Sequence, residues 1–213
     1  MKDKIIFATT NPRKLEDLKE LIKNKNLSFD VITMKDIGWD RGEIEEDGST
    51  IEENSMIKAK ATQEFCKEKN IALPIIADDA GLFVRALGGE PGVKTARYAD
   101  EELKLNPELP KYECVNKLLR KLKNTDDRYA EYQCAITCIL PSGKILTQKG
   151  KTAGKIAEEM DTNIKKPYFY TVFIPEGKTN TMSQLSYKEI QDTYRLKALA
   201  QIFMRIQREL EER

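Results

Sequence analysis

The stretch KIIFATTNPRKLEDLKELI, residues 4–22, decides the fold, because it places a buried strand, a tight turn and an amphipathic helix in succession. Residues 4–8 form a short apolar run that predicts a buried strand. Asn11 is a good N-cap and Pro12 a good first-turn residue, so a helix is expected to begin there. Its apolar residues recur at helical spacing: Leu15, Leu18, Leu21 and Ile22. The stretch therefore predicts the order strand, turn, helix.

Strand and helix patterns alternate along the rest of the chain. Strands are expected at 29–33, 75–77, 129–140, 143–152 and 168–174, with a strand or turn at 81–86. Helices are expected at about 112–123, at 193–211, and at 50–68, where Thr50-Ile51-Glu52-Glu53 has the sequence of a capping box. This order predicts an α/β fold, an elongated mixed β-sheet flanked by helices, with two lobes around a central cleft. Residues 1–213 are expected to form a single domain whose lobes are not independent domains.

The composition indicates a globular protein without a strongly charged partner. Of the 213 residues, 40% are hydrophobic, which is enough for a sizeable core. Lysine plus arginine is 36 against 35 acidic residues, so the basic excess of a typical nucleic-acid binder is missing. The sequence also shows no transmembrane run and no signal peptide. We therefore expect no nucleic-acid or membrane partner and a cytoplasmic location.

The sequence contains no histidine, which limits the chemistry that it can perform. A Ser-His-Asp triad, a Cys-His pair, an HExxH zinc site and a histidine general base are all impossible. The cysteines form no CxxC pair, so they are expected to be reduced core residues rather than zinc ligands. They are Cys66, Cys114, Cys134 and Cys138. Catalysis therefore has to come from carboxylates, lysines, hydroxyls, thiols or a metal ion.

The turn after the first strand is a candidate phosphate site. A strand that runs into a helix N-terminus presents free backbone N–H groups and the positive end of the helix dipole. The hydroxyls of Thr9 and Thr10, together with Asn11 and Lys14, would add donors. The alternative is an ordinary helix cap, since short turns of this kind are common.

Clustered carboxylates and a second lysine complement this turn. Asp78 and Asp79 follow the short apolar strand predicted at 75–77, and ligands of open α/β sheets bind beyond the carboxyl ends of strands. Two acids there are costly without a cation or a hydrogen-bonding role. The acidic run 43–48 is either a metal-binding or a solvated loop, and Lys58 either reaches this site or is solvated. Together these groups are what magnesium-assisted phosphoryl chemistry requires.

Five segments resemble, in order and spacing, the inosine triphosphate pyrophosphatase-like family, whose members hydrolyse unusual purine nucleoside triphosphates such as ITP, dITP and XTP. The matching stretches are FATTNPRK at 7–14, EEDGSTIEEN at 45–54 with Lys58-Ala59, ADDAGL at 77–82, ALGGEPGV at 86–93 with ARYA at 96–99, and FIPEG at 173–177. The resemblance implies hydrolysis to a nucleoside monophosphate plus pyrophosphate with Mg²⁺, usually by a homodimer.

By matching position, the resemblance also implies site residues. Asn11, Lys14 and Lys58 would bind phosphate, and Glu46 would ligate the metal. Asp79 would be a metal ligand or proton acceptor, with Asp78 beside it as a further metal ligand. Asp79 and Lys58 are therefore the expected catalytic residues.

The chain departs from the family's pattern at positions that hold the purine base. Residues 167–171 read PYFYT where the family has F-G-Y-D-P, so Tyr170 takes the place of the aspartate. Ala80 replaces a serine, and Tyr194-Arg195 stand where the family has a histidine within S-H-R-G. Base selection is therefore expected to differ. The residues expected near the base are Ala80, Tyr170, Tyr194 and Arg195. Core packing is the alternative for the aromatic residues of this set and for Tyr168 and Phe169.

Two other functions stay open. One is a catalytically silent, regulatory nucleotide-binding protein, against which the retained Lys14, Lys58, Glu46 and Asp79 argue. The other is a phosphohydrolase that cleaves a different phosphate bond or a modified nucleotide. A dinucleotide oxidoreductase is disfavoured, because no GxGxxG follows the first strand.

Overall fold

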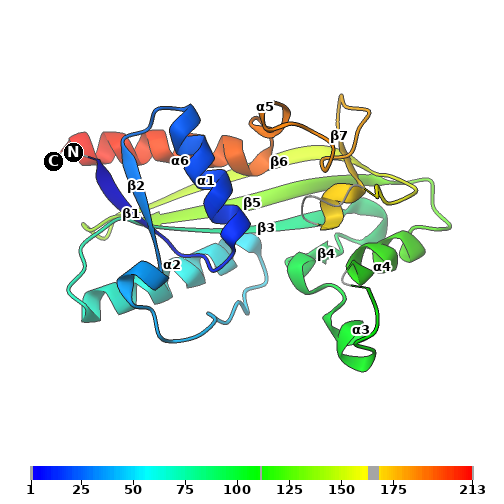
Figure 1. Cartoon of the computed structure of the whole chain (residues 1–213), viewed down its shortest axis with the longest axis horizontal. Helices are drawn as coiled ribbons and strands as arrows, with labels where there is room; N and C mark the ends of the chain where they lie inside the picture. The colour runs from blue at the N-terminus through cyan, green and yellow to red at the C-terminus, as the bar shows by residue number, and fades with distance from the viewer. Residues whose placement is uncertain (1, 111, 163–167, 213) are drawn as a thin grey trace. The chain divides into compact units, whose positions relative to one another are not determined.

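The computed structural model describes residues 2–110, 112–162 and 168–212 (Figure 1). The strands are β1 (Asp3–Phe7), β2 (Phe29–Thr33), β3 (Ile75–Val84), β4 (Pro91–Gly92), β5 (Tyr129–Ile139), β6 (Ile145–Ile156) and β7 (Phe173–Pro175). The α-helices are α1 (Pro12–Asn24), α2 (Ile51–Glu68), α3 (Asp100–Leu105), α4 (Glu113–Lys121), α5 (Tyr187–Ile190) and α6 (Tyr194–Glu211). None of these described helices has the length and apolar character that a membrane span requires.

The described strands form one mixed sheet of seven strands, which confirms the predicted α/β class. Their order is β2-β1-β3-β5-β6-β7, with β4 beside β3. β1 runs parallel to both of its neighbours, pairing Ile5 with Val31 of β2 and Ile6 with Ile75 of β3. β4 and β7 run antiparallel to β3 and β6. α1 is the crossover that a parallel β1–β2 pair needs.

The chain divides into two compact units. Unit 1 consists of Met1–Asp79, Cys134–Gly150 and Tyr194–Arg213, and unit 2 of Ala80–Gln133 and Lys151–Thr193. The single domain over 1–213 and the central cleft between two lobes stay predictions.

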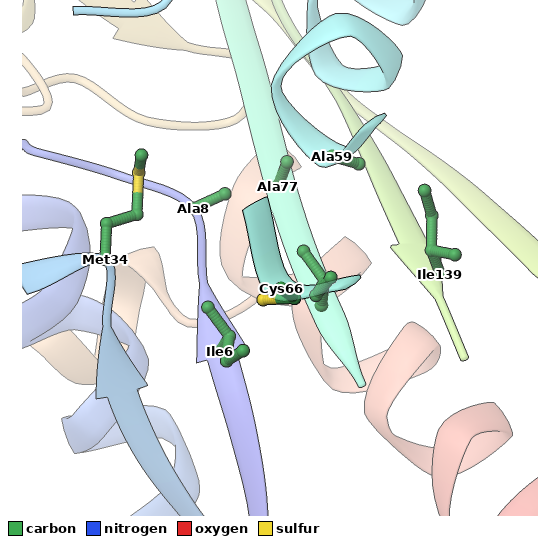
Figure 2. Close-up of a cluster of buried hydrophobic side chains, with 8 residues drawn as sticks. Ile6, Ala8, Met34, Ala59, Cys66, Ala77 and Ile139 are labelled. Atoms are coloured by element: carbon green, nitrogen blue, oxygen red, sulfur yellow. The ribbon is translucent and has the colours of Figure 1, made fainter. Parts of the chain in front are cut away.

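Unit 1 has helices on both sides of its strands. α1 and α6 lie on one side and α2 on the other (Figure 1). Figure 2 shows the cluster on the α2 side, where Ile6 and Ala8 face Ala59 and Cys66 of α2. Ile5 and Phe7 are fully buried as well, since successive strand residues point to opposite faces. The last three residues of β1, Ile5–Phe7, are therefore apolar because both faces of the strand are covered there.

The helix starts follow the predicted capping chemistry. The Asn11 side chain accepts a hydrogen bond from the Arg13 backbone N–H at 3.0 Å, and Pro12 is the first residue of α1. At α2, the Thr50 hydroxyl accepts from the Glu53 N–H at 3.1 Å, while the Glu53 carboxylate accepts from the Thr50 N–H at 3.1 Å. Both caps satisfy N–H groups that a helix start leaves unpaired.

The prediction that the strand ends before Asp78 and Asp79 is wrong. β3 runs from Ile75 to Val84 and contains both acids, each of them buried. Its pairing with β1 reaches only Ile76, so the acids lie on the part of β3 that continues past β1. A strand interior accepts two carboxylates here because each has cationic partners from neighbouring elements.

The strand predicted at 168–174 is also wrong over its first half. Tyr168–Thr171 forms a 3₁₀ helix, and β7 begins only at Phe173. The Thr171 hydroxyl donates to the Tyr168 carbonyl at 2.5 Å, which stabilises the turn. The aromatic and β-branched composition favoured a strand, but this local side-chain bond gives the backbone an alternative.

Gly150 of β6 lets the start of α6 approach the sheet. A Cβ at this position would overlap the carbonyl oxygen of Tyr194 and lie 2.9 Å from the Cβ of Ala198. The same carbonyl accepts a hydrogen bond from the Cys134 thiol at 3.5 Å. The missing side chain of Gly150 therefore sets the position of the first turn of α6.

We predict that Gly150→Ala destabilises the protein by about 1–3 kcal/mol, because the methyl group forces α6 away from β6. Urea unfolding followed by circular dichroism measures the loss. Lys149→Ala, which removes an exposed side chain from the adjacent position, should leave the midpoint nearly unchanged. Equal midpoints for Gly150→Ala and the parent would show that stability does not depend on the close approach of α6 to β6.

Candidate functional site

The two acids of β3 lie on opposite faces of the strand. Asp78 is bound by Lys14 of α1 and Arg195 of α6, whereas Asp79 is bound by Lys58 and Asn54 of α2. This follows from strand geometry, in which neighbouring side chains alternate between faces. The predicted site therefore consists of two clusters that share one strand, both within unit 1.

Asp78 is the centre of the first cluster. Its Oδ1 accepts from the Lys14 Nζ at 3.1 Å and its Oδ2 from the Arg195 Nε at 2.7 Å. Arg195 also donates to the Asp17 carboxylate at 2.8 Å and to the Lys14 carbonyl at 3.0 Å. Burial would raise the pKa of Asp78, but the charges of Lys14 and Arg195 outweigh it and hold the pKa well below its ordinary value.

Lys58 is the centre of the second cluster. Its Nζ lies 2.7 Å from the Glu46 carboxylate and 3.3 Å from the Asp79 carboxylate. Burial opposes the charged ammonium, yet these carboxylates, with Asp78 nearby, raise the pKa of Lys58, so it stays protonated. Burial raises the pKa of Asp79 above its ordinary value, and the charge of Glu46 adds to this, against the opposing effect of Lys58 and Lys14.

Asn54 connects the acidic loop to the strand, and sequence reasoning missed its role. Its side-chain amide donates to Asp79 at 3.2 Å, and its carbonyl oxygen accepts from the Gly48 N–H at 2.9 Å. These bonds fix the loop that carries Glu46. The i, i+4 spacing of Asn54 and Lys58 puts two polar residues on one helix face, and this spacing could have identified Asn54. Asp17, the other residue missed, is a partner of Arg195.

The carboxylate pair of the second cluster is the candidate place for a divalent cation. Glu46 and Asp79 converge on one cation, the Lys58 ammonium, and magnesium typically takes one or two protein carboxylates along with phosphate oxygens. Among the described residues, no group of three or more acidic or cysteine side chains lies so that it could hold a metal ion by itself. Asp78 does not fit as a third ligand, because both of its oxygens bind cations on the other face.

The predicted phosphate-binding turn lies where β1 passes into α1. Thr10 and Asn11 are exposed, and Thr9 and Lys14 are partly buried. The Thr9 hydroxyl accepts from the Asn11 N–H at 3.1 Å, so it shapes the turn. In the first turn of α1, Pro12 carries no N–H and Asn11 caps the N–H of Arg13, so the positive end of the helix dipole and the Lys14 ammonium are what would attract an anion.

The residues that were predicted to lie near the base are buried or half-buried, or pack against other side chains. Arg195 is buried, and its Nε, Nη1 and Nη2 atoms each donate to unit 1, which does not favour contact with a base. Tyr194 is buried as well. Within unit 2, Ala80 is half-buried, and Tyr170 packs edge-on against Tyr132 with ring centroids 5.3 Å apart. Pro167 lies outside the described residues, while Tyr168 is partly buried and Phe169 packs against Tyr98.

Comparison with known proteins shows the family of this chain. The model of the Ham1 family matches residues 5–204. A dITP/XTP pyrophosphatase of Clostridium perfringens is 33% identical over 205 residues, covering 93% of this chain and 95% of that protein. One of Bacillus subtilis is 36% identical over 191 residues, covering 89% and 88%. The solved Ham1 proteins of Staphylococcus aureus and Coxiella burnetii superpose with TM-scores of 0.77 and 0.80, at 32% and 28% identity. Both superpositions include 97% of this chain. They include 100% of the Staphylococcus aureus protein and 99% of the Coxiella burnetii protein.

We predict that Asp78→Asn destabilises the protein by about 3 kcal/mol at neutral pH, because it leaves the buried Arg195 without its main counter-charge. The pKa of Asp78 is lower in the folded chain than in the unfolded one. Its contribution is therefore fully present above the unfolded pKa of about 4 and is lost as the pH falls below it.

Urea unfolding of the parent and of Asp78→Asn at a series of pH values tests this sign. The difference in the free energy of unfolding between the parent and Asp78→Asn should be largest near pH 7 and shrink below about pH 4. Asp127→Asn breaks an exposed pair with Arg85 and serves as the control, with a much smaller loss expected. A difference that grows toward acid pH would contradict the assigned direction.

Proposed function

Because this chain belongs to the Ham1 family, we propose that it hydrolyses a nucleoside triphosphate to the monophosphate and pyrophosphate with the help of a divalent cation. The observation that carries this proposal is the convergence of Glu46 and Asp79 on Lys58, with Lys14 bound to the neighbouring residue of the same strand. The named relatives are dITP/XTP pyrophosphatases, so ITP, dITP and XTP form the proposed substrate class.

The cations of the site bind the triphosphate in this proposal. The positive end of the α1 dipole and the Lys14 ammonium attract phosphate oxygens from one side. The Lys58 ammonium, which its carboxylate neighbours keep charged, contacts phosphate oxygens from the other side. Fixed positive groups of this kind stabilise the charge that develops on phosphate oxygens during phosphoryl transfer.

Glu46 and Asp79 are the proposed ligands of the divalent cation, for which we propose Mg²⁺. When bound, the cation neutralises phosphate charge and lowers the pKa of a coordinated water. Asn54 holds the Asp79 carboxylate in place through its amide. The raised pKa of Asp79 suits a group that accepts a proton from the attacking water, so Asp79 is the proposed general base.

The selection of the base is proposed to differ from that of the family. Arg195 is engaged with Asp78 and Asp17, and Tyr194 is buried, so neither offers a free donor to a purine. Tyr170 and Ala80 remain the proposed contacts. We also propose a homodimer in the cytoplasm, on the basis of the resemblance and of the composition.

We predict that Asp79→Asn lowers kcat by on the order of 10²-fold or more, because it removes the charge that holds the cation and accepts the proton. Steady-state kinetics of pyrophosphate release measures the change. Glu45→Gln removes an exposed acid of the same loop and should retain the parental rate. Asp79→Asn activity within a few-fold of the parent would remove Asp79 from the mechanism.

We expect the purified protein to release pyrophosphate, with Mg²⁺, from at least one of ITP, dITP and XTP. The assay panel adds dUTP, GTP, ATP, CTP and UTP, with Asp79→Asn as the inactive reference. Release of orthophosphate would contradict attack at the α-phosphorus. A strong preference for ITP or XTP over ATP and GTP would contradict the altered base selection while supporting the reaction itself.

A further inference from the structure

Arg195 holds Lys14 at both ends. Its Nη2 donates to the backbone carbonyl of Lys14 at 3.0 Å, and its Nε donates to Asp78 at 2.7 Å. The other oxygen of the same carboxylate accepts from the Lys14 Nζ at 3.1 Å. One guanidinium from α6 therefore fixes the backbone of α1 directly and the lysine side chain through a single carboxylate.

The charges of this cluster decide how firmly Asp78 holds Lys14. The Asp78 side chain is completely buried, so its negative charge requires a partner. Arg195 is buried too and supplies one charge-assisted hydrogen bond to it. The Lys14 side chain remains 23% exposed. With Arg195 present, Lys14 shares the carboxylate. Without Arg195, Lys14 would be the remaining hydrogen-bonded cation on Asp78.

We propose that Arg195 is a positioning residue that keeps the Lys14 ammonium available to an anionic phosphate ligand. It does so by neutralising Asp78, which would otherwise hold Lys14 in a closed ion pair. The inference rests on the proposed function only for the identity of the ligand, since the geometry concerns any polyphosphate that reaches the start of α1.

This role differs from that of a residue that only supports the fold. If Arg195 merely stabilised unit 1, every variant that disrupts the cluster would bind phosphate less well, and removing Asp78 in addition would worsen the defect. If Arg195 acts by neutralising Asp78, removing Asp78 as well should release Lys14 and restore binding. The double variant therefore separates the two roles.

The experiment measures binding of inorganic tripolyphosphate by isothermal titration calorimetry, so that neither a base nor turnover is needed. Arg195→Gln should raise Kd at least about tenfold, the loss expected when one charge-assisted contact to the ligand is withdrawn. Asp78→Asn should bind as tightly as the parent, and the double variant should return to within about threefold of the parent. Lys14→Ala gives the Kd that corresponds to complete loss of the ammonium.

Two further variants control for folding. Arg205→Gln removes another arginine of α6, which donates to the Thr147 carbonyl at 2.6 Å, and should leave Kd unchanged. If Arg195→Gln does not fold, Arg195→Met replaces it, because methionine removes the charge while keeping a long unbranched side chain. Its binding should be weaker than the parent's and should be restored by Asp78→Asn. Thermal unfolding confirms that each variant compared is folded.

The outcomes also separate this inference from the proposed reaction. Unchanged tripolyphosphate binding in Arg195→Gln, or a double variant no better than the single one, overturns the inference even if the parent hydrolyses ITP. Weakened binding that the double variant restores supports it, even if the parent releases no pyrophosphate from any nucleotide of the panel.

Discussion

The burial of the Asp78 carboxylate inside β3 is the constraint on which unit 1 depends. An ionised group removed from water is tolerated only with charged partners and good geometry, and Asp78 obtains these from two helices on one side of the sheet. Lys14 brings the start of α1 to the strand, and Arg195 brings the start of α6. Gly150 makes the second approach possible, since any side chain there would meet the backbone of Tyr194. Fold and site are thus established by the same contacts.

The sequence predicts those parts of the structure that depend on neighbouring residues. The start of α1 follows from Asn11 and Pro12, and the start of α2 from the Thr50 and Glu53 pair, because caps are local. The continuation of β3 through Asp78 and Asp79 could not be predicted in this way, because two acids resemble the end of a strand. Their partners lie as far as 117 residues away. The role of Arg195 escaped prediction for the same reason, whereas Lys58 does reach the carboxylates, which is one of the two alternatives that the sequence left open.

The thiols do not supply the chemistry that histidine would otherwise provide. Burial raises the pKa of Cys134 and of Cys138 to about 12, and that of Cys114 to about 11, so these thiols remain protonated at neutral pH. A protonated thiol is neither a nucleophile nor a metal ligand. All four cysteines are free, and Cys66 packs within the apolar cluster of Figure 2. Reactivity in this protein therefore rests on carboxylates and amines that influence one another's charge.

The separation of Asp78 and Arg195 along the chain has a consequence for biosynthesis. A ribosome adds about 5–20 residues per second, so β3 emerges seconds before the 117 residues that end at Arg195 are complete. During this interval Asp78 has no guanidinium partner, and a nascent chain cannot bury the carboxylate at low cost. Unit 1 can therefore close only after α6 has left the exit tunnel, and until then its apolar strands stay exposed.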